Sequence, residues 1–120
     1  MKIAVASTGK EPTSKVDPRF GRARYFLIYD TEKDEYILLD NAENTNAMQG
    51  AGVQTAQRIA GQQVQIVVSG NIGPKAFVVF KAAGIKAALW AEGTVAEAVE
   101  LIRDNKLKPT ENANVRGHWQ

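Results

Sequence analysis

The chain contains no cysteine and only one histidine among its 120 residues. Without cysteine it forms no disulfide, no zinc finger, no cysteine-ligated iron–sulfur centre and no thiol nucleophile. The single histidine, His118, lies in a polar C-terminal stretch. This position argues against a rigid Ser-His-Asp triad, and one imidazole excludes a metal site built from several histidines. Few groups are left for catalysis.

Excess charge of one sign and long apolar runs are also missing. The 15 basic and 13 acidic side chains leave a net charge of +2, which gives no argument for a nucleic-acid binder. No apolar run approaches the roughly 18 residues of a membrane helix, and the N-terminal run is too short for a signal peptide. We therefore expect a cytoplasmic protein with no nucleic-acid or membrane partner.

The remaining composition, 44% hydrophobic and 23% charged, is typical of one globular domain. Short apolar and aromatic runs predict five strands, and apolar residues at helical spacing predict three helices. The strands are expected at Ile3–Ala6, Tyr25–Tyr29, Tyr36–Leu39, Val64–Val68 and Ile85–Trp90. The helices are expected to end at Gly61, to run from Pro74 to Gly84, and to begin at a Thr94–Glu97 capping box.

The order of these elements predicts an α/β fold. The short polar turn after Tyr29 makes the second and third strands an antiparallel hairpin, whereas the later alternation of helix and strand implies parallel pairing. We expect a mixed five-stranded sheet with helices on both faces, formed by residues 1–107. Residues 108–120 are expected to be a flexible polar tail.

A long loop, Gly9–Gly21, is the first candidate for function. The stretch from Lys10 to Arg24 carries five basic side chains, at positions 10, 15, 19, 22 and 24, against only Glu11 and Asp17. Loops of this length in compact domains are often functional, and arginine presents a planar fork of donors to anions. The alternative is a solvated surface loop that Phe20 anchors to the core.

The second candidate is the turn from Ser69 to Lys75, which follows a buried strand and opens a helix. Free N–H groups and the helix dipole make such a turn an anion site, although a tight glycine-rich turn is the simpler interpretation. Strands one and four are expected to be neighbours at the switch point of the sheet. The loop, this turn and the helix start at Gly50–Gly52 would then share one crevice.

The turn carboxylates give a weaker signal. Four aspartates could in principle hold a divalent ion, but aspartate is common in turns for local reasons, and solvated side chains are the expected outcome. They are Asp17, Asp30, Asp34 and Asp40. A nuclease reaction with two metal ions is not supported, because carboxylates do not cluster on neighbouring strands.

Several segments together resemble the dinitrogenase iron–molybdenum cofactor biosynthesis family. The match runs over nearly all of residues 1–107. The segments that carry it are Ile3–Ala6, Val16, Arg19-Phe20-Gly21-Arg22-Ala23, Tyr25-Phe26, Gly50-Ala51-Gly52 and Gly70-Asn71-Ile72-Gly73-Pro74-Lys75-Ala76-Phe77. The resemblance implies a ribonuclease-H-like fold with strand two antiparallel to the rest. It also implies non-enzymatic, reversible binding of an iron–molybdenum or other metal–sulfur cluster, with cluster-donor and acceptor proteins as partners.

Two positions depart from the family pattern. Arg19 stands where many members have histidine before Phe-Gly-Arg, and Gln49 stands where many have histidine before Gly-Ala-Gly. Metal ligation inside the domain is then left to groups such as Met48, Ser7 or a carboxylate, with His118 as a candidate ligand from the tail. The residues expected to contact the cluster are Ser7, Arg19, Phe20, Gly21, Arg22, Gly50, Gly52, Gly70, Asn71, Gly73 and Lys75.

Two questions stay open at the level of sequence. The same anion crevice would suit a small enzyme or a regulatory module that binds a phosphorylated metabolite. The tail, with Trp119 beside His118, is either docked on its own domain or a movable arm that reaches the cluster or a partner protein.

Overall fold

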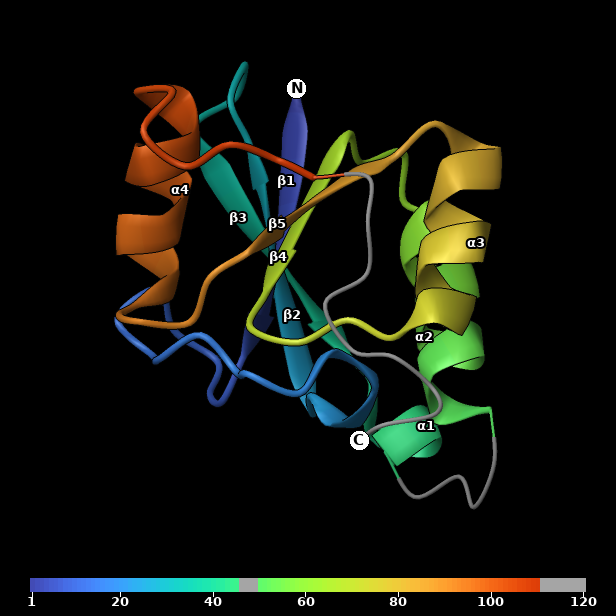
Figure 1. Ribbon diagram of the computed structural model, residues 1–120. Coiled ribbons are helices and arrows are strands. Elements are labelled where there is room, and N and C mark those ends of the chain that lie inside the picture. Colours follow the sequence, from blue (N-terminus) through green and yellow to red (C-terminus); the bar gives the residue numbers. More distant parts are fainter. Residues whose placement is uncertain (46–49, 111–120) are drawn as a thin grey trace.

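The computed structural model describes residues 1–45 and 50–110. A five-stranded sheet in the order β3-β2-β1-β4-β5 forms the centre of the fold (Figure 1). Strand β2 is antiparallel to both β1 and β3, whereas β1, β4 and β5 are mutually parallel, as predicted. The strands are β1 (Lys2–Ser7), β2 (Tyr25–Asp30), β3 (Glu35–Asp40), β4 (Ile66–Ser69) and β5 (Lys86–Leu89).

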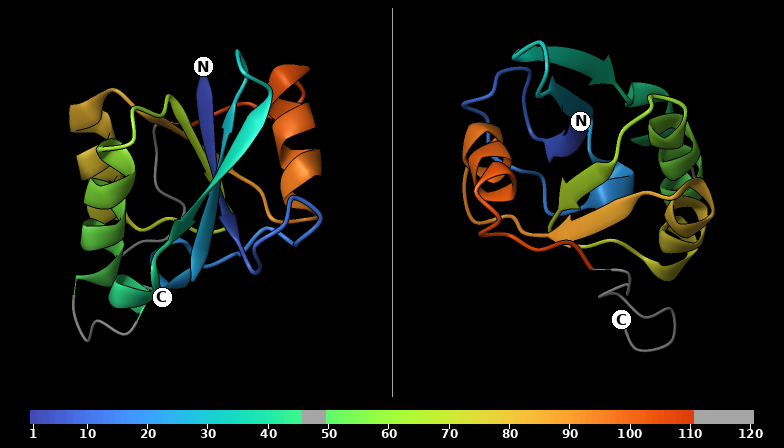
Figure 2. Two further views of the ribbon diagram at one scale, coloured as in Figure 1. Left: turned by 180° about the vertical axis from the view of Figure 1, so that it is seen from behind. Right: turned by 90° about the horizontal axis from the view of Figure 1, so that it is seen from above.

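Helices cover both faces of the sheet, which completes the predicted three-layer α/β architecture (Figure 2). Helices α2 (Ala51–Ala60) and α3 (Pro74–Ala83) lie on one face, and α4 (Val95–Arg103) lies on the other. Two single turns, the 3-10 helix η1 (Phe20–Arg22) and α1 (Ala42–Thr45), occupy segments that the sequence predicted as loop.

The helix ends follow from local sequence. The Thr94 hydroxyl accepts from the Glu97 N–H, and the Glu97 carboxylate accepts from the Thr94 N–H, so the predicted capping box is present at α4. Helix α3 ends at Gly84 with φ 73°, and the Ile85 N–H donates to the Phe80 carbonyl at 2.9 Å. Helix α2 ends at Gly61, as predicted, but this glycine does not adopt the left-handed conformation that ends α3. Its φ is −73°, and the residue with positive φ after α2 is Gln63.

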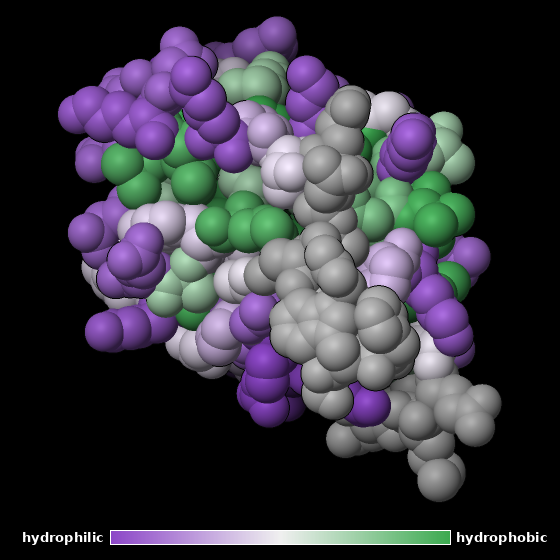
Figure 3. Space-filling view, viewed as in Figure 1, coloured by the Kyte–Doolittle hydropathy of each residue, from purple (hydrophilic) through white to green (hydrophobic). Residues whose placement is uncertain are grey.

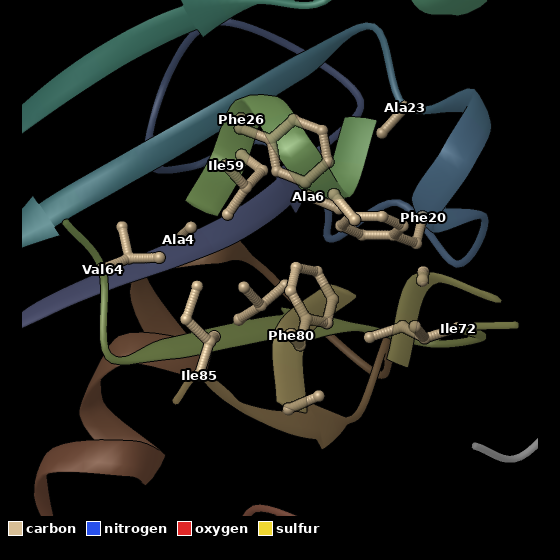
Figure 4. Close-up of a cluster of buried hydrophobic side chains, with 14 of the residues drawn as sticks. Ala4, Ala6, Phe20, Ala23, Phe26, Ile59, Val64, Ile72, Phe80 and Ile85 are labelled. Carbon is tan, nitrogen blue, oxygen red and sulfur yellow. The ribbon is translucent and has the colours of Figure 1, made fainter. Parts of the chain in front are cut away.

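Two apolar clusters form the core, one on each side of the sheet. In the cluster between the sheet and α2–α3, the Phe20 ring packs edge-on against Phe26 and Phe80, with centroids 5.4 and 5.3 Å away (Figure 4). Such aromatic pairs stabilise beyond their buried area. Phe20 is 2% exposed, so the long loop is anchored in the core at this point.

The described chain continues three residues past the predicted domain end. Thr110 pairs with Ala87 at the outer side of β5, where the Thr110 N–H donates to the Ala87 carbonyl at 2.6 Å.

On the face shown in Figure 3, hydrophilic residues gather over the end of α4, and apolar residues lie between α4 and the sheet. Among the described residues, no helix is long and apolar enough to cross a membrane.

Candidate functional site

The long loop and the glycine turn meet where β1 and β4 end. Strands β1 and β4 are parallel neighbours, so the segments that follow them leave the sheet at the same edge. The Asn71 N–H donates to the Pro18 carbonyl at 2.7 Å, and the Phe20 N–H donates to the Asn71 carbonyl at 3.2 Å. A Cβ at Gly70 would lie 2.9 Å from Pro18 Cα. Gly70 thus permits the loop to approach the turn.

A crevice of about 280 Å³ lies beside this junction. Three segments that are distant in sequence contribute to it: η1, the start of α2 and the start of α3. This is the combination predicted from the sequence. The lining residues are Phe20, Gly21, Gly50, Gly52, Val53, Gly73, Pro74, Lys75 and Ala76.

Glycines keep the crevice open. A Cβ at Gly52 or at Gly73 would meet no atom within 4 Å, so both positions border open space. Gly21 has the opposite role, because its Cβ would lie 2.9 Å from Gly52 Cα, and this close approach brings η1 against α2. Gly50 precedes α2 with φ 74°, a left-handed conformation that favours glycine.

Two helix N-termini face this crevice. The first helical bonds are Gln54 N–H to Gly50 in α2 and Phe77 N–H to Gly73 in α3. Four lining residues precede these first helical donors: 52 and 53 in α2, and 75 and 76 in α3. Their N–H groups have no partner among residues 1–45 and 50–110. Free first-turn N–H groups and the positive end of the helix dipole attract anions.

The N-terminus of α4 is arranged differently. Its Val95 and Ala96 N–H groups donate to the Ser14 and Pro12 carbonyls, both at 2.9 Å. The first half of the long loop therefore satisfies the donors of α4, and only the second half reaches the crevice. Of the long loop, Phe20 and Gly21 are the residues that line the crevice.

The structure separates the eleven predicted contact residues into two groups. Six of them line the crevice: Phe20, Gly21, Gly50, Gly52, Gly73 and Lys75. Five lie outside the lining: Ser7, Arg19, Arg22, Gly70 and Asn71. Ser7 is buried and its hydroxyl donates to the Gly9 carbonyl at 2.7 Å. The Arg19 side chain is 70% exposed, with Nε 3.7 Å from the Asp17 carboxylate.

Sequence reasoning missed three lining residues, Val53, Pro74 and Ala76. Each belongs to the first turn of a predicted helix. Their position next to the predicted contact glycines could have identified them as lining residues. Their side chains are apolar, and they leave Lys75 as the charged side chain among the lining residues. The crevice thus combines backbone donors, small apolar side chains and one cation.

Part of the basic surplus of the loop is neutralised nearby. The Arg24 guanidinium lies 3.0 Å from the Asp40 carboxylate and 5.0 Å from the centre of the Tyr25 ring. The hydrogen bond from Arg24, together with one from the Ala42 N–H, lowers the pKa of Asp40. The Arg24 side chain therefore contacts Asp40 and Tyr25 at the ends of β3 and β2, and it does not line the crevice.

The turn aspartates have local partners, but the expectation that all of them are solvated is wrong, because Asp17 and Asp30 are buried. Asp17 accepts from the Arg19 N–H, Asp30 from the Glu32 N–H, and Asp34 from the Tyr29 hydroxyl. In the part of the chain that the structure describes, no three His, Asp or Glu side chains form a metal site. The candidate ligands Met48 and His118, and also Gln49 and Trp119, lie outside the described residues.

A second hollow of about 250 Å³ lies at the other end of α3. It is lined by Phe77, Lys81, Gly84, Ile85 and Lys86. Its two lysines attract an anion, but the C-terminus of α3 carries partial negative charge and offers no first-turn N–H groups to bind one. The crevice at the N-termini of α2 and α3 is the better candidate site.

The fold and this crevice together define a small α/β domain with an open crevice at the N-termini of two helices. The chain belongs to the dinitrogenase iron–molybdenum cofactor family, whose model matches residues 1–105. An uncharacterised protein from Methanocaldococcus jannaschii is 35% identical over 113 residues, which are 92% of each chain.

Two solved structures are similar along nearly the whole chain. The apo form of the orange protein from Desulfovibrio gigas has a TM-score of 0.92 and 34% identity, over 95% of this chain and 96% of that one. A Thermotoga protein of the DUF35 family has a TM-score of 0.81 and 34% identity, over 95% and 97% of the two chains. The fold and the family are therefore shown by independent comparisons.

Proposed function

We propose that the crevice binds an anionic metal–sulfur cluster and that the protein is a non-enzymatic carrier or chaperone for it. The cluster is the iron–molybdenum cofactor, its precursor or a related species. The observation that carries the proposal is the convergence of the α2 and α3 N-termini on one open hollow. Family membership supports it, and so does the orange protein, whose apo form is by definition the ligand-free state of a ligand-binding protein.

The lining suits a cargo that must be released. Backbone N–H groups and the Lys75 ammonium donate hydrogen bonds to cluster sulfides without a covalent link. The open space at Gly52 and Gly73 lets a large anion approach the backbone closely. A chain without cysteine has no thiolate to hold the metal permanently. Arg19 and Arg22, just outside the lining, are proposed to steer the anion.

The composition of the lining favours carriage over catalysis. None of the nine described lining residues is a carboxylate or an imidazole, the groups that most often transfer protons in enzymes. A phosphorylated metabolite would suit the same donors, and a regulatory module that binds one is the alternative. Donor and acceptor proteins for the cluster are the proposed partners, in the cytoplasm, with His118 of the tail as a further proposed ligand.

The experiment that tests the proposal is isolation of the protein without oxygen, followed by visible absorption and by metal and sulfide analysis. We expect molybdenum or iron and acid-labile sulfide that co-elute with the chain. Where the isolated protein is empty, added tetrathiomolybdate should bind with a defined stoichiometry and an altered spectrum. Binding of a phosphorylated metabolite in place of any metal–sulfur species would contradict the proposal.

A further inference from the structure

Strand β3 is an edge of the sheet, and no segment among residues 1–45 and 50–110 pairs with its outer side. Its one described neighbour is β2, and six residue pairs join the two strands without a bulge. Between Glu35 and Asp40 the sequence is Tyr-Ile-Leu-Leu, with no lysine, proline or glycine. Natural proteins protect edges with such residues, with other charged side chains, with bulges or with a covering segment, and here charge is confined to Glu35 and Asp40 at the two ends of the strand. At the opposite edge, Thr110 pairs with β5.

The register identifies which backbone groups of β3 point outward. The Asn41 N–H donates to the Arg24 carbonyl at 2.7 Å, so this pair is hydrogen-bonded. Antiparallel pairs alternate, and Leu39, Ile37 and Glu35 therefore direct their backbone groups to β2. The N–H and carbonyl groups of the alternate residues, positions 36, 38 and 40, point to the free edge and have no partner in the described parts of the chain.

Apolar side chains are exposed on both faces of this edge. Ile37 is 49% exposed and Leu38 is 42% exposed. Successive residues of a strand point to opposite faces, so neither helical layer covers the edge. Figure 2 shows β3 as the outer strand, beyond α4 on one side and α2–α3 on the other. An edge that combines unpaired backbone with apolar side chains favours a second strand beside it.

We propose that β3 pairs with β3 of a second copy of this chain, antiparallel and about a two-fold axis at Leu38, to form a continuous ten-stranded sheet. This register places Leu38 opposite Leu38 of the second copy and Tyr36 opposite Asp40, so all three outward-pointing residues are used. Ile37 then faces Leu39 of the other strand. The symmetry is that of the commonest class of homodimer.

Charge selects this register, because it keeps the carboxylates at the two ends of the strand away from those of the second copy. With the axis at Leu38, Asp40 meets Tyr36 and Glu35 meets Asn41, so no like charges face each other. With the axis moved to Ile37, Asp40 would face Asp34 and only two of the outward-pointing residues would pair. Like charges directly opposite destabilise strand pairing. None of the crevice-lining residues lies on β3, so the dimer is independent of the proposed function.

The first test is the mass in solution. Sedimentation equilibrium at tens to hundreds of micromolar should give twice the 13.1 kDa of one chain. Leu38→Lys should raise the dissociation constant at least about tenfold. Val78→Lys, at a position 69% exposed on α3, is the matched control and should leave the dimer intact. A monomeric wild-type protein, or equal loss in both variants, would overturn the proposal.

The second test uses the absence of native cysteine and does not depend on Leu38→Lys folding. Residues that face each other in an antiparallel hydrogen-bonded pair have Cα atoms about 5.5 Å apart, within the range of a disulfide. Leu38→Cys should therefore cross-link to itself under mild oxidation, faster than Val78→Cys, although position 78 is the more exposed. Equal cross-linking of the two folded variants would refute the register.

Discussion

At the scale of single residues, glycine has two different roles in the crevice. Gly52 and Gly73 border open space, so a methyl group there would occupy volume that the ligand needs. Gly21 and Gly70 lie against backbone atoms 2.9 Å from where a Cβ would stand, so they permit close packing. The first pair should affect binding, and the second pair should affect stability.

Gly52→Ala should separate binding from folding. The position is helical and its Cβ would meet nothing within 4 Å, so the variant should fold and gain about 0.4–1 kcal/mol from the reduced entropy of the unfolded chain. Its affinity for tetrathiomolybdate should fall about tenfold or more, as measured by titration without oxygen. The control is Gly61→Ala at the other end of α2, which should leave affinity unchanged. Unchanged affinity in Gly52→Ala would contradict the assigned site.

Gly70→Ala should destabilise the protein. Its methyl group would overlap Pro18 Cα and Ala91 Cβ, at 2.9 and 3.0 Å, and backbone atoms cannot move aside cheaply. We expect a loss of about 1–3 kcal/mol in the free energy of unfolding, measured with urea. Gly73→Ala, three residues later and in open space, is the matched comparison. Similar losses in both variants would show that space at Gly70 does not explain its role.

At the scale of elements, α4 depends on its cap. Thr94→Ala removes a side chain that accepts from the Glu97 N–H, and such changes cost about 1 kcal/mol. The Thr94 backbone N–H, followed by the Thr94 hydroxyl, lowers the pKa of Glu97. The ionised carboxylate therefore contributes stability above its usual pKa, and this contribution is lost as pH falls through the lowered value.

Urea unfolding as a function of pH tests this account of the cap. The wild-type protein should lose stability in the acid range where Glu97 becomes protonated. Glu97→Gln should be less stable near neutral pH and should lack that part of the acid dependence. If the two pH profiles run parallel through this range, the capping carboxylate does not contribute.

Most elements could be predicted because their signals are local. The capping box fixes the start of α4, Pro74 and Gly84 bound α3, and alternation of strands and helices fixes the parallel pairs. The single turns η1 and α1 could not be predicted in this way. Phe20 folds η1 by packing against Phe26 and Phe80, residues brought to it only by the tertiary structure.

At the scale of the whole molecule, the meeting of three segments at one edge was predictable from topology. Parallel strands β1 and β4 end side by side, so the loop after one and the turn after the other must be close. The division of the long loop was not predictable. The first half of the loop caps α4 through hydrogen bonds such as the one from the Val95 N–H to the Ser14 carbonyl. The composition of the loop does not indicate these bonds. Arg19 and Arg22, which the sequence grouped with the contact residues, lie outside the crevice lining.

Backbone N–H groups at the start of α2 and of α3 are proposed to hold an anionic metal–sulfur species. Nitrogen-15 NMR of the 13.1 kDa chain, titrated with tetrathiomolybdate without oxygen, tests this proposal most directly. We expect the largest amide shift changes at Gly52, Val53, Lys75 and Ala76, and we expect them to saturate together. Changes confined to the hollow at Gly84 and Ile85, or no saturable change at all, would contradict it.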